Sequence, residues 1–183
     1  MGLRLISPRT QSAYQNLTYP KGAYVLQMLR SMMYSLQDQE PDTQFIAMMH
    51  DFVESHRDKA ASTESFKAIA ERHMTKAMNL DGNGRLDWFF DEWVYETQVP
   101  RYHFEYQTSP ADGGKVKLHM TVTQSEVNDH FVMLVPVFAD FGNGMVRLGQ
   151  LGIGGNSTRD LDLLLPSQPK KVVLNAYKDI LER

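Results

Sequence analysis

The sequence has 183 residues, of which 42% are hydrophobic and 22% are charged, which is an ordinary composition for a globular protein with a buried core. The formal net charge of -3 argues against nucleic acid as the main partner, because phosphate binding requires a basic surface. There is no cysteine, which excludes disulfides, thiolate nucleophiles and Cys-ligated zinc.

Helices are predicted in the first hundred residues, where apolar side chains recur at intervals of three and four. The first helix is expected over 21–37 and the fourth over 86–96. Pro20 suits a first helical turn, because the N–H that proline lacks is not needed there. The four apolar stripes contain, in chain order, Val25, Leu26, Leu29, Met32, Met33 and Leu36; Phe45, Met48, Met49, Phe52 and Val53; Phe66, Ile69, Ala70 and His73; and Phe89, Phe90 and Trp93.

Two helix starts carry residues that can accept hydrogen bonds from the first backbone N–H groups. Asp42 or Thr43 can cap the second helix, and Ser62 or Thr63 can cap the third. A polar break precedes the second helix, which is expected to begin at Asp42 or Thr43. The third helix is expected to begin at Ser62 or Thr63.

The period of the hydrophobic pattern changes to two after Pro100. Val116, Leu118, Met120 and Val122 alternate with polar residues, as in a strand with one buried face. Turns rich in Gly and Asn separate this strand and its neighbours. Further strands are expected over 102–108, 131–141, 145–153, 159–165 and 171–175. Short strands at this spacing predict an antiparallel β-sandwich of six or seven strands.

The predicted fold class is therefore α+β, with two domains. Residues 1–100 form a helical lobe of about four helices, and residues 101–183 form the β-sandwich. The boundary is placed near residues 99–102, where the periodicity changes. No stretch approaches the roughly 20 apolar residues that a transmembrane helix needs, so no transmembrane segment is expected in this chain.

The start of the first helix reads Tyr-x-Lys-Gly-Ala at positions 19–23, followed by an apolar run. This motif resembles the zinc aminopeptidases of the aminopeptidase N family (gluzincins). The resemblance continues in order through Thr-x-x-Phe at 63–66 and Phe-Phe-x-x-Trp-Val with a later Pro at 89–100. It implies the helical C-terminal lobe of a thermolysin-like catalytic domain, followed by a small β-sandwich.

The resemblance gives Tyr19 a catalytic role. In that family the Tyr of the motif donates a hydrogen bond to the oxyanion that forms during peptide hydrolysis. A phenol keeps its proton at neutral pH and can make this donation. The alternative is that Tyr19 packs as a hydrophobic staple ahead of the helix. Lys21 and Gly22 match the motif but are assigned no catalytic role, and Arg30 is expected to be an ion-pair partner.

The zinc site of the family is not found in this sequence. It requires His-Glu-x-x-His, because two histidines four apart share one helical face, and no two of the six histidines here have that spacing. The Gly-x-Met-Glu-Asn segment that binds the substrate amino group is also missing. We therefore expect the chain to be a fragment of a metallopeptidase that removes N-terminal residues from peptides. Zinc and the remainder of the catalytic domain would be supplied from upstream, and the chain alone is expected to bind no metal and to be inactive.

A second candidate site is a loop that resembles an EF-hand. Asn79, Asp81 and Asn83 occupy positions one, three and five of a calcium loop, and Asp87 occupies position nine. Position twelve is Phe90, so the bidentate glutamate is missing. The alternative is a Gly/Asn turn that joins two helices.

Two further hypotheses follow from the sequence. The chain could be a non-catalytic module that binds a protein or peptide. If the chain is a fragment, helices that face the missing lobe would expose apolar surface, so self-association is expected.

Overall fold

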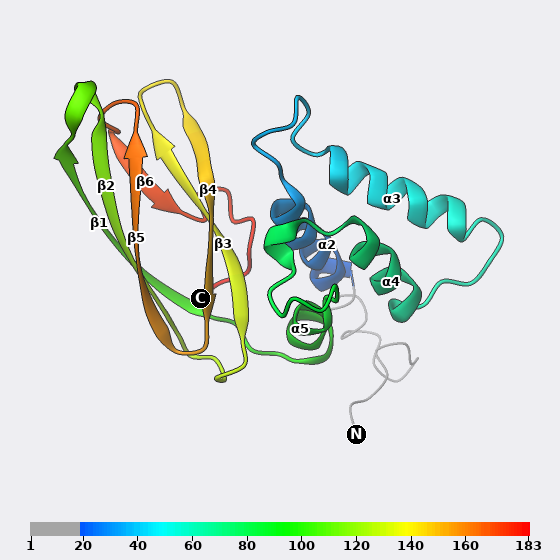
Figure 1. Ribbon diagram of the computed structural model, residues 1–183. Helices are drawn as coiled ribbons and strands as arrows, with labels where there is room; N and C mark the ends of the chain where they lie inside the picture. Colours follow the sequence, from blue (N-terminus) through cyan, green and yellow to red (C-terminus); the bar gives the residue numbers. More distant parts are fainter. Residues whose placement is uncertain (1–18) are drawn as a thin grey trace.

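A computed structural model describes residues 19–183, which form an α+β structure with four α-helices and two three-stranded antiparallel sheets (Figure 1). This confirms the predicted class and the order of helices before strands. The elements are α2 (Tyr19–Met33), α3 (Thr43–Ser55), α4 (Thr63–His73), the 3-10 turn η3 (Lys76–Met78), α5 (Asp87–Phe90), the π-helical turn η4 (Asp91–Tyr95), β1 (Arg101–Pro110), the 3-10 turn η5 (Asp112–Gly114), β2 (Val116–Ser125), β3 (Val132–Asp140), β4 (Met145–Gly154), β5 (Ser157–Leu165) and β6 (Lys171–Leu174).

Helix α2 has Pro20 in its first turn, as predicted, and buries Met28, Leu29 and Met32. Its predicted C-terminal end was wrong, because the helix stops at Met33 and Leu36 is 54% exposed. The chain leaves the helix there for a loop that α3 follows. The apolar stripe thus ends one turn earlier than the sequence pattern indicated.

The two predicted caps differ in outcome. Ser62 caps α4: its hydroxyl accepts from the Ser65 N–H at 3.1 Å, and the Ser65 hydroxyl accepts from the Ser62 N–H at 2.9 Å. Asp42 lies at the start of α3 but makes no capping hydrogen bond, nor does Thr43 replace it. The Asp42 carboxylate is held instead by Arg30, at 2.9 and 2.5 Å, which confirms Arg30 as an ion-pair partner.

The predicted fourth helix is divided into two kinds of helical turn. After α5 the backbone widens into η4, where the Glu96 N–H donates to the Asp91 carbonyl at 2.9 Å, five residues back. A π-helical turn accommodates an extra residue inside a helix. In this one, Glu92 and Trp93 are adjacent and both buried.

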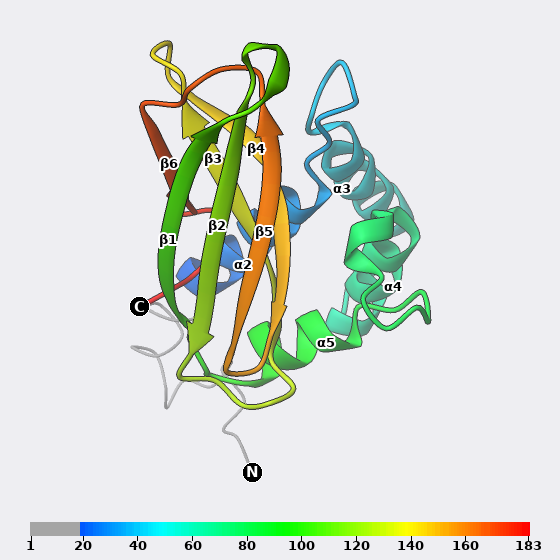
Figure 2. The same ribbon diagram turned by 60° about the vertical axis from the view of Figure 1, so that its left-hand side comes forward.

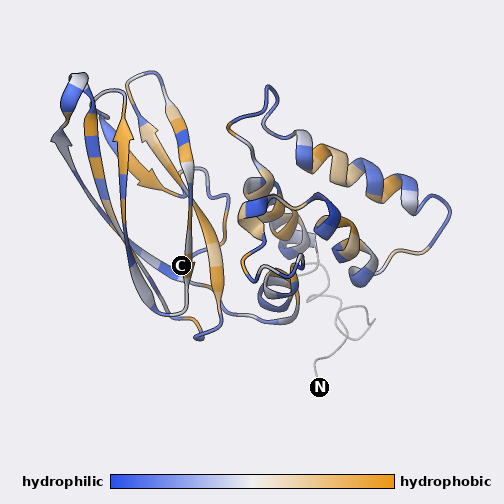
Figure 3. Ribbon diagram, in the orientation of Figure 1, coloured by the Kyte–Doolittle hydropathy of each residue, from blue (hydrophilic) through white to orange (hydrophobic). Residues whose placement is uncertain are grey.

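The six predicted strands are present among the described residues, with ends that differ by one or two residues from prediction. Their order is β1-β2-β5 in one sheet and β4-β3-β6 in the other. The alternation along β2 is confirmed, with Val116, Leu118, Met120 and Val122 buried, and it is visible in Figure 3. Buried side chains of β2 and β5 form one apolar cluster with those of β3 and β6, so the two sheets pack on each other.

Strand β3 occupies the centre of the structure. Every residue from Met133 to Ala139 is buried, because one sheet lies beside it and the helices cover its other side (Figures 1 and 2). The Trp93 ring of η4 lies edge-on to Phe131, with ring centroids 5.5 Å apart. One hydrophobic cluster includes side chains of α2, α5, η4 and β3. The helical and strand segments thus share a core, and the division at residues 100 and 101 into two domains stays a prediction.

Within residues 19–183, no helix is both long enough and apolar enough to cross a membrane.

Candidate functional site

The start of α2 presents the motif that the sequence singled out. Tyr19 is the first residue of the helix, and its side chain is 64% exposed. Two residues on, the Lys21 ammonium donates to the Glu96 carbonyl at 2.9 Å, and burial lowers the pKa of Lys21. This bond joins the first turn of α2 to the end of η4. The bond therefore anchors the first turn of α2, next to the exposed Tyr19.

A cavity of about 340 Å³ lies beside this helix start, and we call it the α2 pocket. Its wall combines apolar side chains with a few polar ones, as small-molecule sites do. Residues from three separate parts of the chain form it: the first turns of α2, the segment around η4, and the C-terminal segment. The lining residues are Pro20, Lys21, Tyr24, Val25, Met28, Glu92, Trp93, Glu96, Thr97, Gln98, Val99 and Leu181.

Glu92 is the unusual residue of the α2 pocket, because its carboxyl group is buried and only half satisfied. The side chain is 6% exposed, and Oε1 accepts from the Val132 N–H at 2.7 Å. Oε2 has no hydrogen-bond partner among the described residues, and neither has the indole N–H of the adjacent Trp93. Buried polar atoms without partners are rare in proteins.

Burial raises the pKa of Glu92 to about 8, and the hydrogen bond from Val132 opposes this effect. The negative charges of neighbouring carboxylates, Glu96 first among them, raise the pKa further. Glu92 is therefore mostly protonated at neutral pH and can donate as well as accept a hydrogen bond.

The sequence interpretation did not identify Glu92 as a functional candidate. A signal was present: Glu92 follows Phe89 by three positions, so the two share the buried face of a helix. A carboxyl group in the middle of an aromatic stripe indicates a buried titratable group, which is a common property of functional sites.

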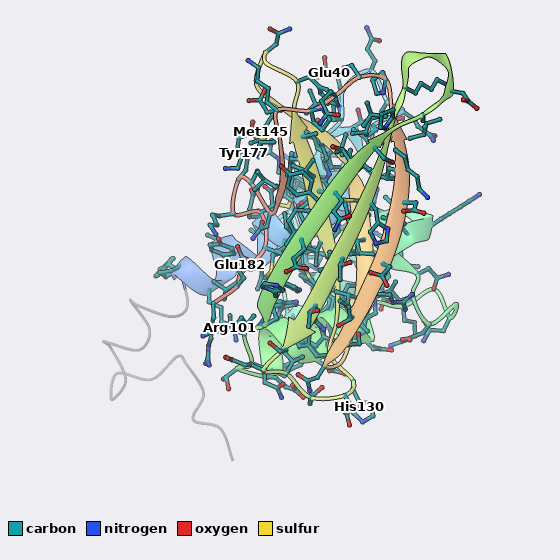
Figure 4. All side chains as sticks on the ribbon, turned by 90° about the vertical axis from the view of Figure 1, so that its left-hand side faces the viewer. Glu40, Arg101, His130, Met145, Tyr177 and Glu182 are labelled. Carbon is teal, nitrogen blue, oxygen red and sulfur yellow. The ribbon has the colours of Figure 1, made fainter. Side chains whose placement is uncertain are left out.

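The C-terminal segment closes one side of this region. The Tyr24 hydroxyl donates to the Lys178 carbonyl at 2.7 Å, and Leu181 contributes to the wall of the α2 pocket. Glu182 of the same segment is labelled in Figure 4. Residues more than 150 positions apart in the sequence are thus held together at the start of α2.

No zinc site is formed by the part of the chain that the structure describes, since no three His, Cys, Asp or Glu side chains are grouped there as metal ligands would be. The histidines of the helical segment have other partners. His56 lies between the Phe52 carbonyl and the Ser65 hydroxyl, at 3.0 and 2.9 Å. His73 lies 3.0 Å from the Asp51 carboxylate. These residues do not fit the zinc that the resemblance implies, so any zinc ligands must lie elsewhere.

The predicted calcium loop is closed by its own hydrogen bonds. The Asn79 side-chain oxygen accepts from the Gly84 N–H at 2.9 Å, and the Asn83 oxygen accepts from the Arg85 N–H at 2.8 Å. Asp81 is exposed.

The last predicted calcium ligand is engaged as well. Asp87 is paired with Arg85 at 2.7 Å and with Lys67, and these hydrogen bonds lower the pKa of Asp87 to about 2. Three of the four predicted ligands, Asn79, Asn83 and Asp87, already accept hydrogen bonds from protein groups.

Helix α3 carries an apolar surface that we call the α3 face. Val53 was expected to be buried in the stripe of this helix, but it is 59% exposed, and Ile46 is 60% exposed. Of the residues in α3, only Met48 is fully buried. The helix packs against its neighbours on one side alone, which leaves these apolar side chains in solvent.

Comparison of the sequence with protein-family models and with curated proteins gives no match in either case.

Proposed function

We propose that this chain forms the C-terminal helical lobe and β-sandwich of a zinc-dependent aminopeptidase, in which Tyr19 stabilises the transition state of peptide hydrolysis. The exposure of Tyr19 carries the proposal. A staple would bury its ring against the helix, whereas Tyr19 is 64% exposed and directly precedes Pro20, a residue of the α2 pocket wall. An exposed phenol at a fixed helix start is positioned to reach a substrate that another part of the enzyme holds.

Tyr19 would act by hydrogen bonding alone. When water attacks the scissile carbonyl, negative charge develops on its oxygen, and a phenol O–H donates more strongly to that oxyanion than to the neutral carbonyl. The bond from Lys21 to Glu96 fixes the first turn of α2, so the donor is positioned before the reaction. Zinc, when bound in the intact enzyme, would supply the activation of the attacking water. In the proposal its ligands come from residues outside 19–183, together with the rest of the catalytic domain.

The α2 pocket suits part of a peptide substrate. Apolar residues such as Val25, Met28 and Leu181 line it next to the helix that begins with Tyr19. The same cavity also supports the alternative proposal, a non-catalytic module that binds a peptide side chain there. The two proposals differ in what the loss of the Tyr19 hydroxyl does: it would lower turnover in the first and change nothing but affinity in the second.

The first experiment is to read the coding DNA upstream of Met1. A reading frame that continues into His-Glu-x-x-His and a later glutamate supports the peptidase. A stop codon directly before Met1 refutes it and favours the binding module.

In the intact enzyme, Tyr19→Phe should lower kcat by roughly 100- to 1,000-fold with little change in KM, because one oxyanion donor is lost. Hydrolysis of an aminoacyl p-nitroanilide measures both constants. Tyr106→Phe, in β1 of the β1-β2-β5 sheet, is the matched control and should leave kcat unchanged. Near-normal turnover of Tyr19→Phe would contradict the proposed role.

A further inference from the structure

A second cavity, of about 300 Å³, is separate from the motif at the start of α2. We call it the Arg147 pocket. Four parts of the chain meet there: the later turns of α2, the segment before α3, strands β3 and β4, and the C-terminal segment. Met145 and Tyr177, both labelled in Figure 4, belong to its wall. Its volume lies at the lower end of the range of small-molecule sites, roughly 300–1,000 Å³.

Arg147 enters the cavity from β4 as a half-buried cation with neutral partners. Its guanidinium donates to the Ser31 carbonyl at 2.8 Å, to the Ser31 hydroxyl at 3.2 Å and to the Gln150 side-chain oxygen at 3.1 Å. No carboxylate of residues 19–183 lies within ion-pair distance of it. Buried cations are normally paired, because removing a charge from water is costly.

The hydrogen bonds of Arg147 leave part of its donor set unused. A guanidinium has five N–H groups, and the contacts above engage Nη1 and Nη2 but not Nε. The Tyr34 ring lies under the guanidinium, 4.8 Å from its carbon, and holds it in place. Burial lowers the pKa of Arg147, and the charge of Asp179 opposes this effect.

Asp179 supplies a negative charge to the cavity, and one of its two carboxylate oxygens remains available to a ligand. Its Oδ1 accepts from the Gln27 amide at 2.9 Å, while Oδ2 accepts no hydrogen bond from the described residues. The remaining charges in the cavity, Arg30 and Asp42, neutralise each other through two hydrogen bonds at 2.9 and 2.5 Å. The cavity therefore holds one spare cationic donor and one spare carboxylate oxygen.

Three aromatic side chains also belong to the wall of this cavity. Tyr34 and Phe138 each face the Arg147 guanidinium, and the Tyr177 ring lies edge-on to Phe138 with centroids 5.2 Å apart. Aromatic walls favour an apolar or aromatic side chain. A ligand that is complementary to all of these groups is a small molecule with a carboxylate, an ammonium group and an apolar side chain.

We propose that the Arg147 pocket binds a free α-amino acid with a large apolar side chain. The guanidinium of Arg147 binds its carboxylate, Asp179 binds its ammonium group, and the side chain packs between Tyr34, Phe138 and Tyr177. This inference is independent of the proposed peptidase function, since none of these residues belongs to the α2 pocket.

Calorimetry of the 183-residue chain with L-phenylalanine tests the proposal. L-Phenylalaninamide lacks the carboxylate and N-acetyl-L-phenylalanine lacks the ammonium group. Each analogue should bind about 10- to 100-fold more weakly than the amino acid, because one charge-assisted hydrogen bond is lost. Absence of heat with L-phenylalanine up to about 10 mM, or equal affinity for all three compounds, overturns the proposal.

Two variants assign the charges. Asp179→Asn keeps an acceptor for Gln27 but removes the charge, so it should weaken L-phenylalanine about tenfold and leave N-acetyl-L-phenylalanine unchanged. Arg147→Gln should weaken L-phenylalanine and leave the amide unchanged. Arg159→Gln, at an exposed residue of β5, is the control and should bind like the wild type.

Circular dichroism of each variant identifies loss of folding. Should Arg147→Gln unfold, the analogue series and Asp179→Asn still decide the question. An Asp179→Asn variant that binds all three compounds as the wild type does refutes the assignment of the ammonium group. An equal loss of affinity in Arg159→Gln refutes a specific site.

Discussion

The buried carboxyl of Glu92 predicts a specific dependence of stability on pH. Its pKa is raised from the ordinary value of 4.5 to about 8 in the folded protein. Below pH 4.5 Glu92 is protonated in both the folded and the unfolded state and has no effect. Between pH 4.5 and 8 the unfolded chain releases the proton while the folded protein keeps it, so the free energy of unfolding falls as pH rises.

The size of the effect follows from the width of this pH window. A window of about 3.5 pH units, at about 1.4 kcal/mol per unit, corresponds to a loss of about 5 kcal/mol on going from pH 4.5 to 8. Small domains have a free energy of unfolding of about 5–15 kcal/mol in total. The loss due to Glu92 alone would therefore be a large fraction of the stability of this protein. Above pH 8 both states are ionised and the loss stays constant.

The substitution Glu92→Gln removes this titration while keeping an oxygen for the Val132 N–H. Urea unfolding of both proteins should show that the stability of Glu92→Gln relative to the wild type rises by about 4 kcal/mol between pH 5 and 9. The comparison cancels the contributions of all other titrating groups, which the two proteins share. Glu105→Gln, an exposed glutamate of β1, serves as the control and should show no such trend. A difference between Glu92→Gln and wild type that stays within about 1 kcal/mol across this range would show that Glu92 is not protonated by burial.

Three other predictions concern the helical segment. Ser62→Ala should lower the free energy of unfolding by about 1 kcal/mol, because the N–H of Ser65 loses its cap; urea unfolding measures this, and an unchanged midpoint would contradict it. Titration with millimolar calcium should give no heat, because the ligands of the predicted loop are engaged in internal hydrogen bonds, and measurable binding would refute that reasoning. The chain should self-associate through the α3 face, and light scattering should show that Ile46→Glu with Val53→Lys reduces the mean mass; a wild type that is monomeric at high concentration would exclude this surface as an interface.

Periodicity accounted for the parts of the fold that depend on local pattern. The alternation of Val116, Leu118 and Met120 predicted the buried face of β2, and the spacing of turn residues placed six strands. The cap of α4 was also predicted, as Ser62 or Thr63, and Ser62 provides it. Contacts of this kind lie within one turn of helix or one strand, where the sequence alone determines the geometry.

Features that depend on contacts distant in the sequence were not predictable. Asp42 or Thr43 was expected to cap α3, but Arg30 of the preceding helix holds the Asp42 carboxylate and no side chain caps the helix. The α2 pocket requires Glu92 and Leu181 to meet the start of α2, and nothing in the local pattern of either segment indicates that meeting. Arg147 was likewise an unremarked residue of a predicted strand.

The double burial of β3 has a consequence for how the protein unfolds. Leu134 belongs to a cluster shared with the helices, whereas Val137 and Ala139, on the opposite face of the strand, belong to the cluster between the sheets. Separation of β3 from the helices or from the β1-β2-β5 sheet would expose one of these clusters to water. The free-energy cost is roughly 25 cal/mol for each Å² of apolar surface exposed. Unfolding of the helices and unfolding of the β1-β2-β5 sheet are therefore coupled through β3. Residues 19–183 should melt in one transition with one denaturant slope, whichever segment carries the spectroscopic probe.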